Sequence, residues 1–110
     1  MATYTPTQLK PVTALTASAA DLVKPAGGHT SIVRTFVVNA NTGSRTVTLD
    51  NNTSTADTAA TRLVDAYALT ANVPWIVNAW LVYDSTTWLV GLASAAGSTV
   101  MFNANGYDYA

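Results

Sequence analysis

The chain has 110 residues, of which 49% are hydrophobic and 10% are charged, and its formal net charge is −1. It contains no Cys, no Glu and a single His. This excludes disulfide bonds and Cys/His zinc sites, and it leaves few of the side chains that acid–base and nucleophilic catalysis need. The small net charge also disfavours electrostatic binding to nucleic acid. We therefore expect one domain that is not an enzyme and that holds no cofactor or metal ion.

The first eleven residues are polar and contain Pro6 and Pro11. We expect residues 1–11 to form an extended N-terminal arm and residues 12–110 to form a single β-sandwich domain. The start of the chain lacks the basic and apolar regions of a signal peptide. No stretch approaches the roughly 20 apolar residues of a membrane-spanning helix. These observations predict a protein that is made in the cytoplasm and does not contact a membrane.

Alternation of apolar with polar residues predicts short β-strands along most of the chain. Residues 17–23 fit either a helical turn or a strand, and residues 55–62 fit a helical turn. The tail from residue 106 is predicted to be exposed or docked on another surface. The predicted strands cover residues 12–16, 30–39, 45–49, 63–69, 75–83, 87–92 and 98–103.

The clearest predicted strand is 30–39, where strict alternation places Arg34 on the same face as Phe36. The strand at 45–49 is expected to form a hairpin with it or to lie nearby. The strand at 87–92 is expected to pair back on 75–83 through a tight turn.

About six to eight short strands with turn signals every 8–12 residues are typical of all-β folds. The abundance of Thr and Val agrees, because β-branched residues favour strands. We therefore predict a small antiparallel β-sandwich or a jelly-roll-like barrel.

The order of these strands and turns resembles the small β-sandwich virion structural proteins of tailed bacteriophages. In the resemblance, one strand ends in an Asn-containing turn, and a later hairpin leads to Ala-Ser-Ala and a short last strand. The resemblance spans residues 12–104, and the aromatic residues around Trp75 and the Tyr-containing tail depart from it. The segments that carry it are residues 32–42, 46–49, 69–72, 81–90 and 93–100.

This resemblance implies a structural, non-enzymatic role on a phage head or tail. We expect a capsid decoration or minor capsid protein that binds the head shell and its own copies, with a trimer as the expected assembly. The expected partners are further copies of the chain and a major capsid or tail protein, and the expected location is the virion. A tail component and a carbohydrate-binding module for host attachment remain the alternatives.

Aromatic residues are the strongest candidates for a contact surface. Trp75 and Trp80 are five residues apart, so they fall on opposite faces of one strand, and only one of them can enter the core. The other must be covered by a sheet, a loop or another chain. Core or subunit packing is favoured over a sugar-stacking platform. The candidate interface residues are Tyr4, Trp75, Trp80, Trp88, Tyr107 and Tyr109.

Two polar features are weaker candidates. Residues 50–57 place oxygen-bearing side chains as a calcium loop would, but the Gly and Glu of an EF-hand loop are replaced by Thr55 and Thr61. A polar surface loop is therefore favoured there. His29 follows a Gly-Gly turn, and we expect it to bond locally rather than to bind a metal.

Overall fold

The computed structural model describes residues 3–41, 43–94 and 100–110, which form eight β-strands and one short 3₁₀-helix. The elements are β1 (Tyr4–Leu15), β2 (Ala20–Val23), β3 (Thr30–Ala40), β4 (Arg45–Asn52), η1 (Ala59–Thr61), β5 (Arg62–Leu69), β6 (Trp75–Tyr83), β7 (Trp88–Ala93) and β8 (Val100–Tyr109).

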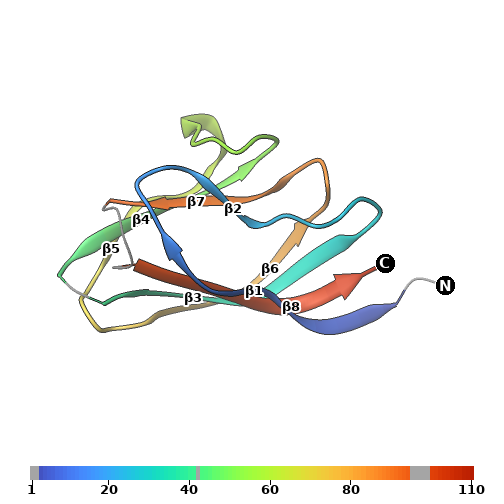
Figure 1. Ribbon diagram of the computed structural model, residues 1–110, viewed down its shortest axis with the longest axis horizontal. Coiled ribbons are helices and arrows are strands. Elements are labelled where there is room, and N and C mark those ends of the chain that lie inside the picture. Colours follow the sequence, from blue (N-terminus) through green and yellow to red (C-terminus); the bar gives the residue numbers. More distant parts are fainter. Residues whose placement is uncertain (1–2, 42, 95–99) are drawn as a thin grey trace.

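The strands form two four-stranded antiparallel sheets that face each other (Figure 1). Sheet A has the order β1-β8-β3-β6, and sheet B has the order β2-β7-β4-β5. Consecutive strands lie in opposite sheets, except for β4 and β5. Eight strands in this order make a jelly roll, in which two Greek keys wrap around one core. The predicted antiparallel β-sandwich is therefore confirmed.

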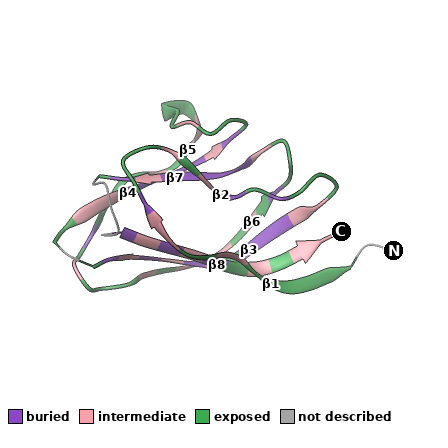
Figure 2. Cartoon of the chain, viewed as in Figure 1, coloured by how far each residue is buried: buried purple, intermediate pink, exposed green. Residues whose placement is uncertain are grey.

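The core fills the space between the two sheets. Its fully buried side chains come mainly from the central strands β3, β8, β4 and β7, and they include Val33, Leu49, Leu89 and Phe102. Figure 2 shows buried residues along these strands, whereas the first half of β1 is exposed. Removal of this apolar surface from water is the main favourable term that holds the sheets together.

The pairing predicted for residues 87–92 is wrong, and so is the hairpin that was one of the two expectations for residues 45–49. β3 and β4 do not form a hairpin, and β7 does not pair with β6, because in each case the chain crosses from one sheet to the other. The Asp84 carboxylate accepts hydrogen bonds from the backbone N–H groups of Thr86 and Thr87 at 2.8 and 3.0 Å. This compact polar turn redirects the chain between sheets, and in sequence it looks the same as a hairpin turn.

The N-terminal segment differs from the prediction, and the tail, expected to be exposed or docked, is part of a strand. Residues 4–11, expected as an arm, belong to β1 and pair with β8, so no boundary falls at residue 11. The tail continues β8 as far as Tyr109. Thr3 and Ala110 exchange two backbone hydrogen bonds of 3.0 and 3.3 Å, which places both ends at one side of sheet A (Figure 1).

A β-bulge at Arg34 interrupts the alternation of β3. Val33 pairs with Gly106 and Thr35 pairs with Asn105, so Arg34 has no partner in β8. The buried core includes Val33 and Phe36, one on each side of the bulge. Strict alternation, which placed Arg34 with Phe36, is therefore wrong for this strand. The extra residue shifts the phase by one position, as bulges do.

Gly106 permits this bulge. A Cβ atom at position 106 would lie 1.8 Å from the carbonyl oxygen of Ile32 and 3.0 Å from the backbone nitrogen of Arg34. Both atoms belong to the backbone of β3, so neither can move without disturbing the sheet. A glycine is therefore required where β8 passes the bulge.

We predict that Gly106→Ala lowers the free energy of unfolding by about 2–3 kcal/mol, because the methyl group must separate the central strands of sheet A. Chemical denaturation followed by tryptophan fluorescence measures the change. Gly27→Ala is the control, since a Cβ atom there meets nothing within 4 Å. It should change stability by less than about 0.5 kcal/mol. Equal effects of the two substitutions would contradict the assigned role of Gly106.

Candidate functional site

The outer face of sheet A carries an open hollow with aromatic walls. It is lined by Tyr4 from β1, Arg34 from β3, Trp80 from β6 and Tyr107 from β8, and its volume is about 490 Å³. Each of the four strands thus contributes one side chain. We call these four residues the aromatic hollow. Tyr4 and Trp80 are each 61% exposed, so their rings are available to a ligand or a partner.

The side chains of the aromatic hollow support one another. The guanidinium carbon of Arg34 lies 4.7 Å from the centre of the Trp80 ring, which is a cation–π contact. The Tyr4 ring meets Tyr107 edge-on, with 6.3 Å between centroids, and it lies 4.5 Å from Tyr109. These contacts restrict the side chains before anything binds.

The bulge places the Arg34 side chain next to Trp80 on the outer face of sheet A. Val33 pairs with Leu81 and Thr35 pairs with Asn78, which leaves Arg34 opposite two residues of β6, Ala79 and Trp80. β-Bulges re-aim side chains in this way and are common next to functional sites.

Trp75 and Trp80 do lie on opposite faces of β6, as the sequence predicts. The half-buried Trp75 ring stacks on Tyr67 of sheet B at 3.9 Å, with an interplanar angle of 12°. It also meets Phe36 edge-on at 5.6 Å. Trp75 therefore joins the two sheets at their β5–β6 edge and does not reach the aromatic hollow.

Next to this stack, an apolar cleft of about 230 Å³ opens between β5 and β6. The inward-facing side chains of β6 are only partly buried there, whereas those of the central strands are fully buried. We call this opening the edge cleft. It is lined by Phe36, Leu63, Val64, Trp75, Val77, Ala79 and Leu81.

Trp88 lies elsewhere, in sheet B, and only 7% of it is exposed. Its indole N–H donates to Asp21 at 2.7 Å, and the Lys24 amine lies 4.1 Å from its ring centre. The structure thus gives Trp88 a packing role within the chain. Of the six candidate interface residues, Tyr4, Trp80, Tyr107 and Tyr109 come together on one face, and Trp75 and Trp88 lie apart from them.

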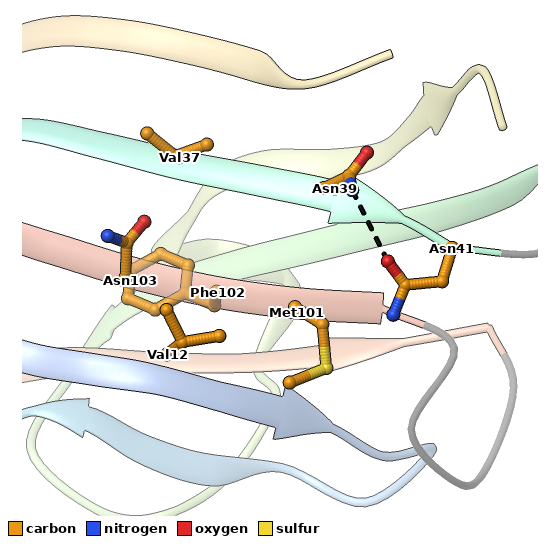
Figure 3. Close-up of a pocket in the computed structure, with 7 residues that line it drawn as sticks. All are labelled: Val12, Val37, Asn39, Asn41, Met101, Phe102 and Asn103. Atoms are coloured by element: carbon orange, nitrogen blue, oxygen red, sulfur yellow. Dashed lines mark hydrogen bonds between the residues drawn. The ribbon is translucent and has the colours of Figure 1, made fainter. Parts of the chain in front are cut away.

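A second, smaller hollow lies at the other end of the outer face of sheet A (Figure 3). Met101 reaches from β8 toward β1, beside Val12. The Asn39 side-chain amide donates to the Asn41 oxygen at 3.3 Å. This end combines apolar and amide groups, and none of its lining residues is charged or an aromatic on the surface.

Residues 53–61 form a loop over the outer face of sheet B (Figure 1) and cover the fully buried Asp50. One Asp50 oxygen accepts hydrogen bonds from the Thr58 backbone and the Thr61 hydroxyl at 3.4 and 3.2 Å. Burial, and then the nearby Asp57 carboxylate, raise the pKa of Asp50. Arg62 binds both oxygens of Asp57 at 2.9 and 2.8 Å and lowers the pKa of that carboxyl.

These contacts make residues 50–57 part of the hydrogen-bonded loop region that covers the outer face of sheet B. Among the described residues, no group of three or more His, Cys, Asp or Glu side chains could hold a metal ion. His29 does bond locally through its backbone N–H, which donates to the Ala26 carbonyl at 3.0 Å, but its side chain does not: Nδ1 lies 3.0 Å from Asp108, which is 79 residues away in the chain. His29 thus ties the β2–β3 turn to β8.

In the part of the chain that the structure describes, no helix is long and apolar enough to cross a membrane.

The sequence did not identify Arg34 as a site residue. Regular alternation predicted that it shares a face with core residues, and only the pairing with Gly106 reveals the bulge. Gly106, three residues beyond the predicted strand at 98–103, was the feature of the sequence that could have indicated a bulge or a close backbone approach.

Comparison of the chain with protein-family models, with curated proteins and with solved structures found no match in any of the three.

The buried Asp50 generates a prediction for stability against pH. Its pKa is higher in the folded state than its ordinary value of 3.8. The folded state therefore binds the proton more tightly, and this contribution to stability is lost as pH rises above 3.8 through the folded pKa. Asp50→Asn cannot titrate, so its stability relative to the wild type should increase between pH 4 and pH 7. Urea unfolding across this range measures the difference, and parallel pH profiles would contradict the prediction.

Proposed function

We propose that this protein is a structural component of a bacteriophage virion, a capsid decoration or minor capsid protein that binds the head shell and its own copies. The resemblance of its strand and turn order to small phage virion proteins supports this proposal. The jelly-roll fold agrees with it, because viral capsid domains use this fold, although lectin domains do as well. The observation that carries the proposal is the edge cleft.

Exposed apolar side chains gather on the two strands that form the edge cleft and on the segment that connects them. Among the described residues, nine large hydrophobic side chains are exposed, and six of them lie on β5, on β6 or between the two strands. Clustered exposed apolar side chains mark interaction surfaces more often than isolated ones do. β5 and β6 are also edge strands, whose outward backbone groups are open to pairing. The six residues are Leu63, Tyr67, Val73, Ile76, Trp80 and Val82.

A second copy of the chain is the partner that we assign to this cleft. The net charge of −1 gives little repulsion between copies. Two concave clefts cannot fill each other, so the cleft must receive a different surface of the neighbour. Such a contact is heterologous, and heterologous contacts that close produce rings. A trimeric ring is the assembly that we propose, and several linked copies would bind a repeating shell with avidity.

We predict that light scattering coupled to size exclusion, or native mass spectrometry, finds a trimer for the wild-type protein. Leu63→Asp places a charge at the mouth of the edge cleft and should weaken the trimer by a factor of about 30 or more, as expected for the loss of an interface hot spot. Val12→Asp is the matched control. Val12 is 63% exposed on β1, at the opposite edge of sheet A, and its substitution should leave the trimer intact. A wild-type monomer at all concentrations would contradict self-association through the edge cleft.

A further inference from the structure

We propose that the aromatic hollow binds a carboxylated carbohydrate, such as a uronic or sialic acid residue of an oligosaccharide. This goes beyond the proposed assembly role and does not depend on it. The aromatic hollow and the edge cleft share no residue, so the two functions can be tested separately.

The shape of the aromatic hollow suits a sugar ring. It is shallow and open, and its walls are the rings of Tyr4, Trp80 and Tyr107. A pyranose has an apolar C–H face that packs on an aromatic ring, while its hydroxyl groups stay in water or meet polar groups at the rim. Tyr and Trp fit this task because they offer a flat apolar surface with a polar tip and few rotatable bonds. The volume of about 490 Å³ lies in the range of small-ligand sites.

Arg34 supplies the preference for an acid. The described residues include no carboxylate that forms an ion pair with it, and its charge contact is with the Trp80 ring. The guanidinium N–H donors are therefore free to bind a ligand. A planar guanidinium group binds a carboxylate through two parallel hydrogen bonds, which makes the carboxyl group of an acidic sugar its best partner.

Two polar side chains lie farther along the strands that carry Tyr4 and Tyr107. Gln8 and Asn105 pair in register on β1 and β8, and both are exposed. Neither forms a side-chain hydrogen bond with another described residue. Their amide groups can thus donate to, and accept from, sugar hydroxyl groups.

The site is arranged before a ligand binds. The bulge fixes the backbone of Arg34, and Gly106 holds the bulge in place. The Arg34 side chain rests on Trp80, and Tyr4 is held by Tyr107 and Tyr109. A preformed site loses little conformational freedom on binding, so even a small ligand can be held. A single cation is a weak basis for binding a nucleic-acid backbone, which needs several phosphate contacts.

The test compares acidic and neutral members of matched oligosaccharide pairs. Tetragalacturonate is paired with its methyl ester, and sialyllactose is likewise paired with its methyl ester. Binding is followed by ¹H–¹⁵N NMR shifts and by tryptophan fluorescence. We expect at least one acid to bind roughly tenfold or more tightly than its neutral counterpart, because the charged hydrogen bonds to Arg34 are lost in the neutral sugar. The shifts should centre on residues 34, 80 and 107.

Three variants assign the binding to the aromatic hollow. Trp80→Ala should abolish binding of both members of a pair. Arg34→Gln should reduce the affinity for the acidic sugar to the affinity for the neutral sugar. Arg34→Lys should give an intermediate affinity, because it keeps the positive charge and loses the planar guanidinium group. Val12→Ala is the control, since Val12 is 63% exposed on β1 of the same sheet and lies outside the hollow. It should bind as the wild type does.

The titration is also performed on Leu63→Asp, so that a failure of assembly and a failure of sugar binding can be told apart. Binding of an acid by this variant supports the proposal whether or not the wild type forms a trimer. The absence of binding by both proteins overturns it. Equal affinity for acid and neutral sugars, or unchanged binding by Arg34→Gln and Trp80→Ala, also overturns it.

Discussion

The close approach of β8 to β3 at Gly106 is the constraint on which the candidate site depends. At this point the two backbones leave no space for a side chain, and β3 accommodates the contact with one extra residue, Arg34. The extra residue changes which side chains face the core. Val33 and Phe36 both enter it, although they are three positions apart, and Arg34 is left on the outer face beside Trp80. A backbone irregularity in the centre of the sheet thus places Arg34 in the wall of the aromatic hollow.

The two apolar surfaces of the molecule follow from its topology. In a jelly roll the chain crosses between the sheets at almost every turn. Each of the two sheets has two edge strands and one outer face. The β5–β6 edge is incompletely closed, because inward side chains such as Val77 and Leu81 are only partly buried. The outer face of sheet A carries the aromatic hollow, which has a cation in its wall. One surface is therefore suited to another protein chain, and the other to a small polar ligand.

Much of the fold could be predicted from the sequence, because local alternation reports which segments are strands. The predicted strand at 75–83 has the observed bounds, and the opposite faces of Trp75 and Trp80 followed from their spacing. Pairing between strands could not be predicted, because a short polar turn serves both a hairpin and a crossing between sheets. The position of Arg34 could not be predicted either, since the bulge depends on β8, about 70 residues later in the chain.

The most direct test of this account is the orientation of Arg34, which nuclear Overhauser effects in the wild-type protein can measure. The account predicts effects between the Arg34 side chain and the indole protons of Trp80, with the Arg34 side-chain protons shifted upfield by the ring. It also predicts that Phe36 contacts Phe102 and that Val33 is buried among the core side chains. Effects between Arg34 and core side chains, with none to Trp80, would show regular alternation in β3 and would contradict the account.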